Sequence, residues 1–333
     1  MKRGTCTFLL ITVLTAGTSW HEALACTSIM VGKNASRDGS VMTSHTCDSH
    51  RTGSGIVVVH RKKHGSGDTI QLTKRTDDDS GPMERYGREP TGKIPQVAET
   101  FGYLNPAYAA MNEYQVAIGE STFGGREELK SDAGLVDCET LTRLMLERAR
   151  TAREAIRIGG ALIEEYGWND EGEALTIADK HEVWLMEIVG PGEGEVGAVW
   201  AAQRIPDDEV AVVANASRIA EVDLGDPQYF MSSAKVMAVA EKNGWWSADS
   251  GEPFRFHEVY DPNGRFSFAS TRREWRVLGL LAPSLELHAN ANSFPLSVKP
   301  ESPVGPEKIM ELFRDNFEET DYDMVKHLTI TDE

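Results

Sequence analysis

Residues 23–33 read Ala-Leu-Ala-Cys-Thr-Ser-Ile-Met-Val-Gly-Lys, and the interpretation of the chain depends on this stretch. The segment before Cys26 has the features of a secretory signal: a basic start, an apolar run over residues 8–16, and small residues just before the cysteine. Cleavage after Ala25 would make Cys26 the first residue of the mature protein. One residue would then carry both a thiol nucleophile and a free α-amino group able to act as its base.

The composition indicates a folded globular protein of one large domain. The chain has 333 residues, of which 40% are hydrophobic and 26% charged. A net charge of −18 argues against binding to nucleic acid through a basic surface. After residue 25 we find no apolar run long enough for a membrane span. The sequence therefore predicts a signal peptide over residues 1–25, one domain over residues 26–333, and a secreted or periplasmic location, with a homo-oligomer left open.

A second interpretation of Cys26 is lipid attachment, as in bacterial lipoproteins. Such sites usually have leucine three residues before the cysteine, whereas this chain has Ala23 there and Leu24 one place later. A lipid would also block the amino group. This alternative stays open, as a lipid-anchored binding protein without catalytic activity.

The remaining cysteines leave two possibilities. Cys6 would be removed with the signal, so Cys47 and Cys138 remain beside Cys26. These two could form a disulfide in an oxidising compartment, or they could be separate thiols. No Cys-x-x-Cys pair is present, and we expect no structural metal site.

The order of the predicted elements indicates an α+β fold. A helical region over residues 139–166 contains a capping-box pattern at residues 151–154 and therefore predicts two consecutive helices. The polar residues 62–82 predict an exposed loop. Alternating or β-branched runs predict strands at residues 27–31, 41–44, 56–60, 115–119, 174–179, 183–189, 199–203 and 210–214. Blocks of strands separated by helices favour stacked antiparallel sheets over a parallel sheet.

Five ordered blocks resemble peptidase family C69, dipeptidases of the N-terminal-nucleophile hydrolase type related to penicillin V acylase and bile salt hydrolase. The blocks are residues 26–40, 112–122, 175–187, 213–219 and 273–276. The resemblance implies a four-layer αββα sandwich with Cys26 at the active site. It also implies hydrolysis of a dipeptide through a thioester acyl-enzyme, with no metal and no cofactor.

The resemblance further assigns candidate site residues. Asp48 matches an acidic residue that holds the α-amino group. Thr122 and Asn215 fall where related acylases have contributors to the oxyanion hole. Arg273 matches an arginine of the wider superfamily, with Arg276 as the alternative. Each also has a structural interpretation, because Asp and Asn are common in turns and arginine on solvated faces.

The chain departs from the family pattern in two places. His45 stands where many relatives have arginine, which changes the charge beside the nucleophile, and we assign it to substrate binding. His45, Asp48 and His50 lack the spacing of a familiar metal site. The family also continues beyond the length of this chain, which predicts a sandwich that is C-terminally truncated. Besides the dipeptidase, an acylase acting on a penicillin or a conjugated bile acid remains an alternative.

Overall fold

The computed structural model describes residues 25–48, 55–83 and 85–326. The predicted signal segment before Ala25 and the loop residue His50 lie outside this range. Within it, no helix is both long and apolar enough to cross a membrane.

A smaller antiparallel sheet carries the N-terminal strand of the described chain. Its order is β17-β15-β1-β2, and β3 also pairs with β1. The prediction of a strand at residues 27–31 is confirmed. The strands of this sheet are β1 (Ala25–Val31), β2 (Met42–Thr43), β3 (Thr46–Asp48), β15 (Val210–Val213) and β17 (Ser297–Val298).

A larger antiparallel sheet faces the first. Its order is β16-β14-β13-β12-β11-β10-β9-β4, so its central strands follow one another in the chain. Most of the predicted strands belong to it. They are β4 (Val57–Val59), β9 (Tyr103–Asn105), β10 (Met111–Asn112), β11 (Ala117–Phe123), β12 (Gly172–Ala178), β13 (Val183–Val189), β14 (Val199–Arg204) and β16 (Phe230–Ser232).

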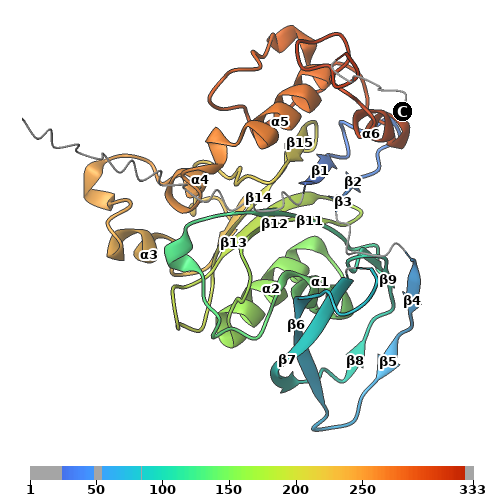
Figure 1. The fold of residues 1–333 in the computed structure, drawn as a ribbon, viewed down its shortest axis with the longest axis vertical. Helices are drawn as coiled ribbons and strands as arrows, with labels where there is room; N and C mark the ends of the chain where they lie inside the picture. The colour runs from blue at the N-terminus through green and yellow to red at the C-terminus, as the bar shows by residue number, and fades with distance from the viewer. Residues whose placement is uncertain (1–24, 49–54, 84, 327–333) are drawn as a thin grey trace, which may run out of the picture.

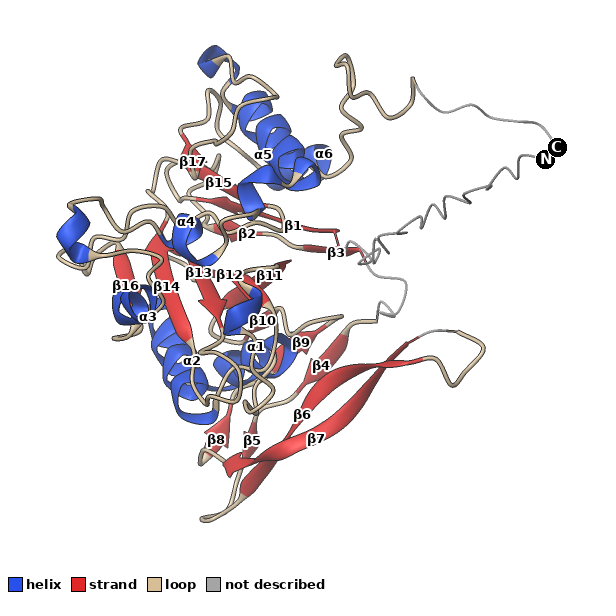
Figure 2. Ribbon diagram, turned by 60° about the vertical axis from the view of Figure 1, so that its left-hand side comes forward, coloured by secondary structure: helices blue, strands red, loops and turns tan. Residues whose placement is uncertain are grey.

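Helices cover the outer side of each sheet (Figures 1 and 2). The helices α1 and α2 lie against the larger sheet, and α5 and α6 lie against the smaller one. The prediction of an α+β fold is confirmed. The helices are α1 (Cys138–Arg148), α2 (Ala152–Tyr166), α3 (Val236–Lys242), α4 (Phe256–Tyr260), α5 (Phe268–Leu281) and α6 (Pro306–Leu312), with short 3₁₀ turns at Glu127–Leu129, Ala248–Ser250, Gly264–Phe266 and Pro283–Leu285.

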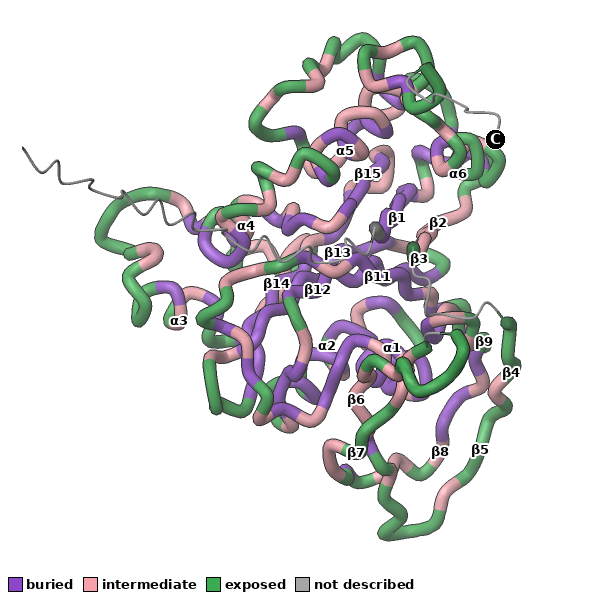
Figure 3. The backbone as a smooth tube through the Cα atoms, viewed as in Figure 1, coloured by how far each residue is buried: buried purple, intermediate pink, exposed green. Residues whose placement is uncertain are grey.

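Side-chain alternation explains how two sheets and two helical layers share three hydrophobic cores. In β1, Ile29 and Val31 belong to the core shared with α5 and α6, whereas Met30 belongs to the core between the sheets. In β13, Trp184 packs with the α1–α2 layer and Leu185 faces the smaller sheet. The central strands are therefore buried on both faces, as Figure 3 shows. The two-residue period of a strand thus fixes which side chains can reach the space between the sheets.

The predicted helical pair is confirmed. Thr151 is the N-cap residue of α2, and its hydroxyl accepts a hydrogen bond from the Glu154 backbone N–H at 3.2 Å. This is the N-cap half of the predicted capping box.

The exposed loop predicted at residues 62–82 is wrong. The segment contains β5 (Lys62–Lys63), which pairs with β8 (Glu99–Thr100), and the whole of β6 (Thr69–Asp78), which pairs with β7 (Arg85–Pro95). The β6–β7 hairpin projects from the body of the protein (Figure 2), and within β6 only Leu72 is fully buried. A two-stranded ribbon with so little buried surface keeps a polar composition, which the sequence pattern cannot tell from a loop.

Candidate active site

Cys26 lies near the start of β1, where β1 pairs with β3. Its side chain is buried, with 2% exposed. Its backbone nitrogen donates a hydrogen bond to Asn215 Oδ1 at 2.9 Å. The nitrogen that cleavage after Ala25 would turn into an α-amino group is therefore already held by one of the predicted site residues.

Arg273 on α5 fixes the backbone around Cys26. One guanidinium nitrogen donates to the Cys26 carbonyl oxygen at 2.6 Å and to Thr27 Oγ1 at 2.9 Å. The other donates to Asn215 Oδ1 at 2.9 Å. Arg276, the alternative candidate, instead pairs with Asp315 at 2.7 Å. Of the two arginines, the geometry brings only Arg273 to Cys26.

Asn215 connects the two sheets at this point. It follows β15 with a φ of 56°, a left-handed conformation that asparagine tolerates better than most residues. Its backbone N–H donates to Ser121 Oγ at 2.9 Å, and its side-chain amide donates to the Thr122 carbonyl oxygen at 2.7 Å. Thr122 thus contacts Asn215 through its backbone, and its hydroxyl donates to Glu173 at 3.0 Å.

The sulfur of Cys26 faces an acidic side chain that the sequence did not single out. Its thiol donates to Glu120 Oε1 at 3.4 Å, and Glu120 on β11 is 1% exposed. His45 reaches the same oxygen from the loop between β2 and β3, with Nε2 at 3.5 Å. A Cβ on Gly119 would lie 3.0 Å from the His45 Cβ, so this approach requires glycine. His45 therefore lies beside Glu120, close to the sulfur of Cys26.

Glu120 and Glu173 form a buried carboxyl pair. Both lie on neighbouring strands of the larger sheet and are almost completely buried. Burial and the adjacent Glu120 carboxyl raise the pKa of Glu173 well above its ordinary value. Two carboxylates this close cannot both be charged at low cost, so Glu173 keeps its proton and shares it with Glu120.

A second thiol lies directly across from Cys26. Cys47 on β3 is its partner in the antiparallel register. The hydrogen bond with Cys47, burial and the charge of Glu120 all raise the pKa of the Cys26 thiol above its ordinary value. The thiol therefore holds its proton, and attack by this sulfur requires a base. Cys47 and Cys138 are free thiols in the structure, so the separate-thiol alternative applies.

Asp48 is placed at the edge of this arrangement. It ends β3, lies opposite Ala25 in the register, and is exposed. The assignment of Asp48 to the α-amino group of Cys26 stays a prediction. Sequence reasoning missed the roles of Glu120, Ser121, Glu173 and the neighbouring Cys47. The available signal was the acidic residue Glu120 within the strand at residues 117–123.

A cleft of about 940 Å³ opens beside these residues. Thr122, Asn215 and Arg273 line it, together with β6 and the segment from residue 261 to residue 270. Its walls carry both basic and acidic side chains, among them Arg75 and Asp261. The cleft can therefore receive a polar ligand of mixed charge next to the groups that hold Cys26.

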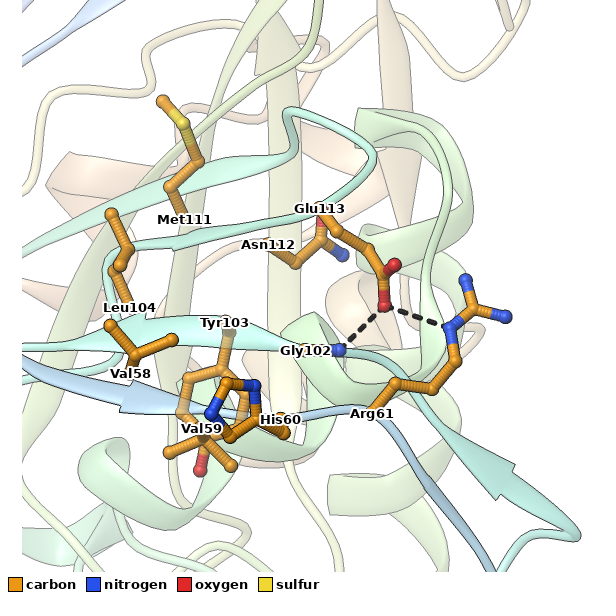
Figure 4. Close-up of a pocket in the computed structure, with 10 residues that line it drawn as sticks. All are labelled: Val58, Val59, His60, Arg61, Gly102, Tyr103, Leu104, Met111, Asn112 and Glu113. Atoms are coloured by element: carbon orange, nitrogen blue, oxygen red, sulfur yellow. Dashed lines mark hydrogen bonds and ion pairs between the residues drawn. The ribbon is translucent and has the colours of Figure 1, made fainter.

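A second hollow, shown in Figure 4, lies at the end of the larger sheet. Val58, Leu104 and Met111 give it an apolar wall, and on the other side Glu113 accepts hydrogen bonds from Arg61 and the Gly102 N–H at 3.0 and 2.7 Å. None of the predicted site residues lines this hollow.

A buried carboxylate supports the loop that carries Asn215. Glu187 on β13 accepts hydrogen bonds from Ser217 Oγ at 2.5 Å and from the Ile219 N–H at 3.2 Å. Burial raises the pKa of Glu187 to about 7. The loop after β15 is thus tied to the larger sheet, and Asn215 keeps its position between the sheets.

Comparison with known proteins gives one consistent result. The model of peptidase family C69 matches residues 25–332. Similar proteins include a probable dipeptidase of Latilactobacillus sakei (28% identical; 91% of this chain, 62% of the relative), probable dipeptidase A of Streptococcus pyogenes serotype M1 (27%; 91% and 63%) and a probable dipeptidase of Salmonella dublin (24%; 91% and 69%). The chain spans somewhat less than two thirds of the length of the first two relatives.

Proposed function

We propose, since the chain belongs to peptidase family C69, that it is a cysteine dipeptidase in which Cys26 is the nucleophile. The observation that carries the proposal is the set of contacts around Cys26. Its nitrogen is held by Asn215, its carbonyl by Arg273, and its sulfur faces the buried carboxyl of Glu120. Asn215 and Arg273 also line an open cleft. The dipeptidase names of the relatives agree with a small peptide as substrate.

Removal of residues 1–25 would activate this arrangement. The Cys26 nitrogen would become an amine, which can donate one N–H to Asn215 and keep its lone pair for the thiol. An α-amino group titrates near pH 8, so a useful fraction is neutral at physiological pH. Because the Cys26 thiol holds its proton, this amine supplies the base that the sulfur needs.

The reaction would proceed in two steps. The amine takes the thiol proton while the sulfur attacks the peptide carbonyl, and the same proton passes to the departing amino acid as the C–N bond breaks. Water then attacks the thioester, gives one proton to the Cys26 amine, and releases the second amino acid with the thiol restored. No metal or cofactor takes part.

The contacts divide the supporting roles. Asn215 Oδ1 orients the Cys26 nitrogen, while its side-chain amide donates a hydrogen bond to the Thr122 carbonyl oxygen. This favours a positioning role for Asn215 over donation to the oxyanion. Arg273 orients both Cys26 and Asn215. Asp48 is the further candidate for contact with the free amine. In this proposal the layers form the N-terminal-nucleophile sandwich, and export and activation occur through one cleavage.

The test is the chemistry of the mature N-terminus together with dipeptide turnover. Mass spectrometry should find a chain that begins at an unmodified Cys26. Against a panel of dipeptides, Cys26→Ala should reduce hydrolysis to background and Cys26→Ser should reduce it at least about 100-fold. Cys138→Ser is the matched control, because this thiol lies outside the proposed mechanism. Full activity of Cys26→Ala, or a lipid on Cys26, would contradict the proposal.

A further inference from the structure

The nucleophile has a second sulfur as its nearest cross-strand neighbour. Cys26 and Cys47 are directly paired between β1 and β3, so their side chains leave the sheet on the same side. The Sγ atoms of both cysteines and a carboxylate oxygen of Glu120 all lie within 4.8 Å of one another. These three residues are called the thiol cluster below.

The spacing of the thiol cluster fits a tetrahedral metal ion. A zinc ion with a Zn–S distance of about 2.3 Å and a Zn–O distance of about 2.0 Å separates these two ligand atoms by about 3.5 Å. The observed distance from Cys26 Sγ to Glu120 Oε1 is 3.4 Å. Small shifts of side chains would therefore complete three of the four ligand positions.

We propose that the thiol cluster binds a zinc ion and that this ion inhibits the enzyme by occupying its nucleophile. The binding site stands on the geometry of Cys26, Cys47 and Glu120 alone. The inhibition rests on the proposed function, because it requires that Cys26 be the attacking group.

The donor set is chemically suited to zinc. Two soft thiolates with one carboxylate match the ligands that zinc prefers over magnesium or calcium. His45 offers a fourth donor, because its buried Nε2 lies 3.5 Å from Glu120 Oε1 and makes no hydrogen bond with the described residues. In the part of the chain that the structure describes, no lysine or arginine forms an ion pair with Glu120 or Glu173. A divalent cation would offset this buried acidity.

A neighbouring group is a weaker candidate. Glu120, Cys138 and Glu173 also lie within 4.8 Å of one another, but all three are fully buried and offer only one sulfur. The thiol cluster has two sulfurs, and Cys47 is only partly buried. The thiol cluster is therefore the less buried of the two groups.

Zinc binding and peptide hydrolysis would exclude each other. On binding, both thiols release their protons to solvent, and the sulfur of Cys26 then shares its electron pair with the metal. In a chain that begins at Cys26, the amine would be a further donor, since the nitrogen and sulfur of one cysteine close a five-membered ring around an ion. Both the nucleophile and its base would be withdrawn, and a chelator would raise activity.

Cobalt substitution tests the site directly. The full chain is reduced, freed of metal and titrated with Co²⁺, which gives an ultraviolet thiolate-to-cobalt band whose intensity grows with the number of thiolates. Wild type should bind one equivalent with the intensity of two thiolates, displaced by one equivalent of Zn²⁺. Cys47→Ser should halve the band and weaken binding at least tenfold, and Glu120→Gln should weaken binding while keeping two thiolates. Cys138→Ser should match wild type.

Two outcomes would overturn the site: a wild-type protein without a thiolate band, and a band that depends on Cys138 but not on Cys47. Free thiols are counted before each titration, so that a disulfide between Cys26 and Cys47 cannot be mistaken for lack of affinity. Circular dichroism of each variant checks the fold, and Glu120→Gln provides an answer if Cys47→Ser does not fold.

Activity provides the second readout. In the presence of Zn²⁺, dipeptide hydrolysis by wild type should fall and recover with chelator, and Cys47→Ser should need at least tenfold more zinc for the same fractional inhibition. If no dipeptide is hydrolysed, the proposed function fails and the cobalt titration still decides the site. If hydrolysis occurs but zinc inhibits both proteins equally, the inhibitory role is wrong.

Discussion

The two sides of Cys26 are built from opposite chemistry. On the side of the smaller sheet and α5, Asn215 and Arg273 hold the nitrogen and carbonyl of Cys26 with direct hydrogen bonds. On the side of the larger sheet, Glu120 places a buried carboxyl group against the sulfur, and the buried carboxyl of Glu173 lies next to Glu120. We call these the backbone-holding side and the acidic side.

The difference separates two tasks. The backbone-holding side restricts where the nitrogen and sulfur can point, so its contribution is orientation. The pKa of the Cys26 thiol is raised by its hydrogen bond with Cys47, by burial and by the charge of Glu120, so the acidic side helps to keep the sulfur protonated until a base acts. Changes on the first side should therefore reduce turnover most, and the buried carboxylates should affect mainly stability and its pH dependence.

Among the residues that hold Cys26, replacing Arg273 should have the largest effect on turnover. Arg273→Lys keeps the positive charge, but one ammonium group cannot serve the Cys26 carbonyl, Thr27 and Asn215 together. We expect kcat/KM for a dipeptide to fall about 100-fold to 1,000-fold, in the range of losing a preorganised donor. Steady-state kinetics on the mature chain measure this.

Arg276→Lys is the matched control, since Arg276 belongs to the same helix but pairs with Asp315. Its kcat/KM should stay within about threefold of wild type, because this partly exposed ion pair lies away from Cys26 and lysine keeps the positive charge. Equal losses in the two variants would show that α5 acts through stability and not through its contact with Cys26.

The backbone-holding side was more accessible to sequence reasoning than the acidic side. Cys26, Asn215 and Arg273 stand in recognisable local blocks, and the structure brings them together. Glu120 was harder to identify because it contacts Cys26 across the space between the two sheets. No local sequence pattern specifies which residues of two facing sheets meet.

The same contrast holds for the fold. The helical pair at residues 139–166 was predictable because its apolar stripe and N-cap are local. The β6–β7 hairpin was not, because its residues are mostly polar and its pairing partner lies beyond a turn.

Two substitutions at Asn215 distinguish the effect of its backbone conformation from the effect of its side-chain contacts with Cys26. Asn215→Ala and Asn215→Gly both lose the contacts with Cys26, but glycine accepts the φ of 56° freely. We expect both variants to lose about tenfold to 100-fold in kcat/KM, with Asn215→Gly about 1 kcal/mol more stable than Asn215→Ala. Kinetics and urea unfolding measure the two quantities. Near wild-type turnover by Asn215→Gly would mean that only the backbone conformation matters.

Replacing Glu187 should have the smallest effect on turnover. It tests whether this buried, hydrogen-bonded carboxyl beneath the Asn215 loop affects the free energy of unfolding and its pH dependence. Its pKa is about 7 in the folded protein against an ordinary value of 4.5, and burial is the main cause. Between these values the folded state binds more protons than the unfolded state, so the free energy of unfolding falls as pH rises. The whole loss is about 3 kcal/mol, complete above the folded pKa.

Glu187→Gln should remove this term, because its amide can still accept from the backbone N–H of Ile219 and donate to Ser217 Oγ. The free energy of unfolding, measured by urea between pH 5 and pH 7.5, should therefore decline less steeply in Glu187→Gln than in wild type. Glu187→Leu is the control that removes the same ionisation together with the hydrogen bonds, so it should share the flatter pH dependence and be less stable throughout. Parallel curves for wild type and Glu187→Gln would mean that Glu187 ionises in the folded state as easily as in the unfolded chain, and that its hydrogen bonds offset its burial.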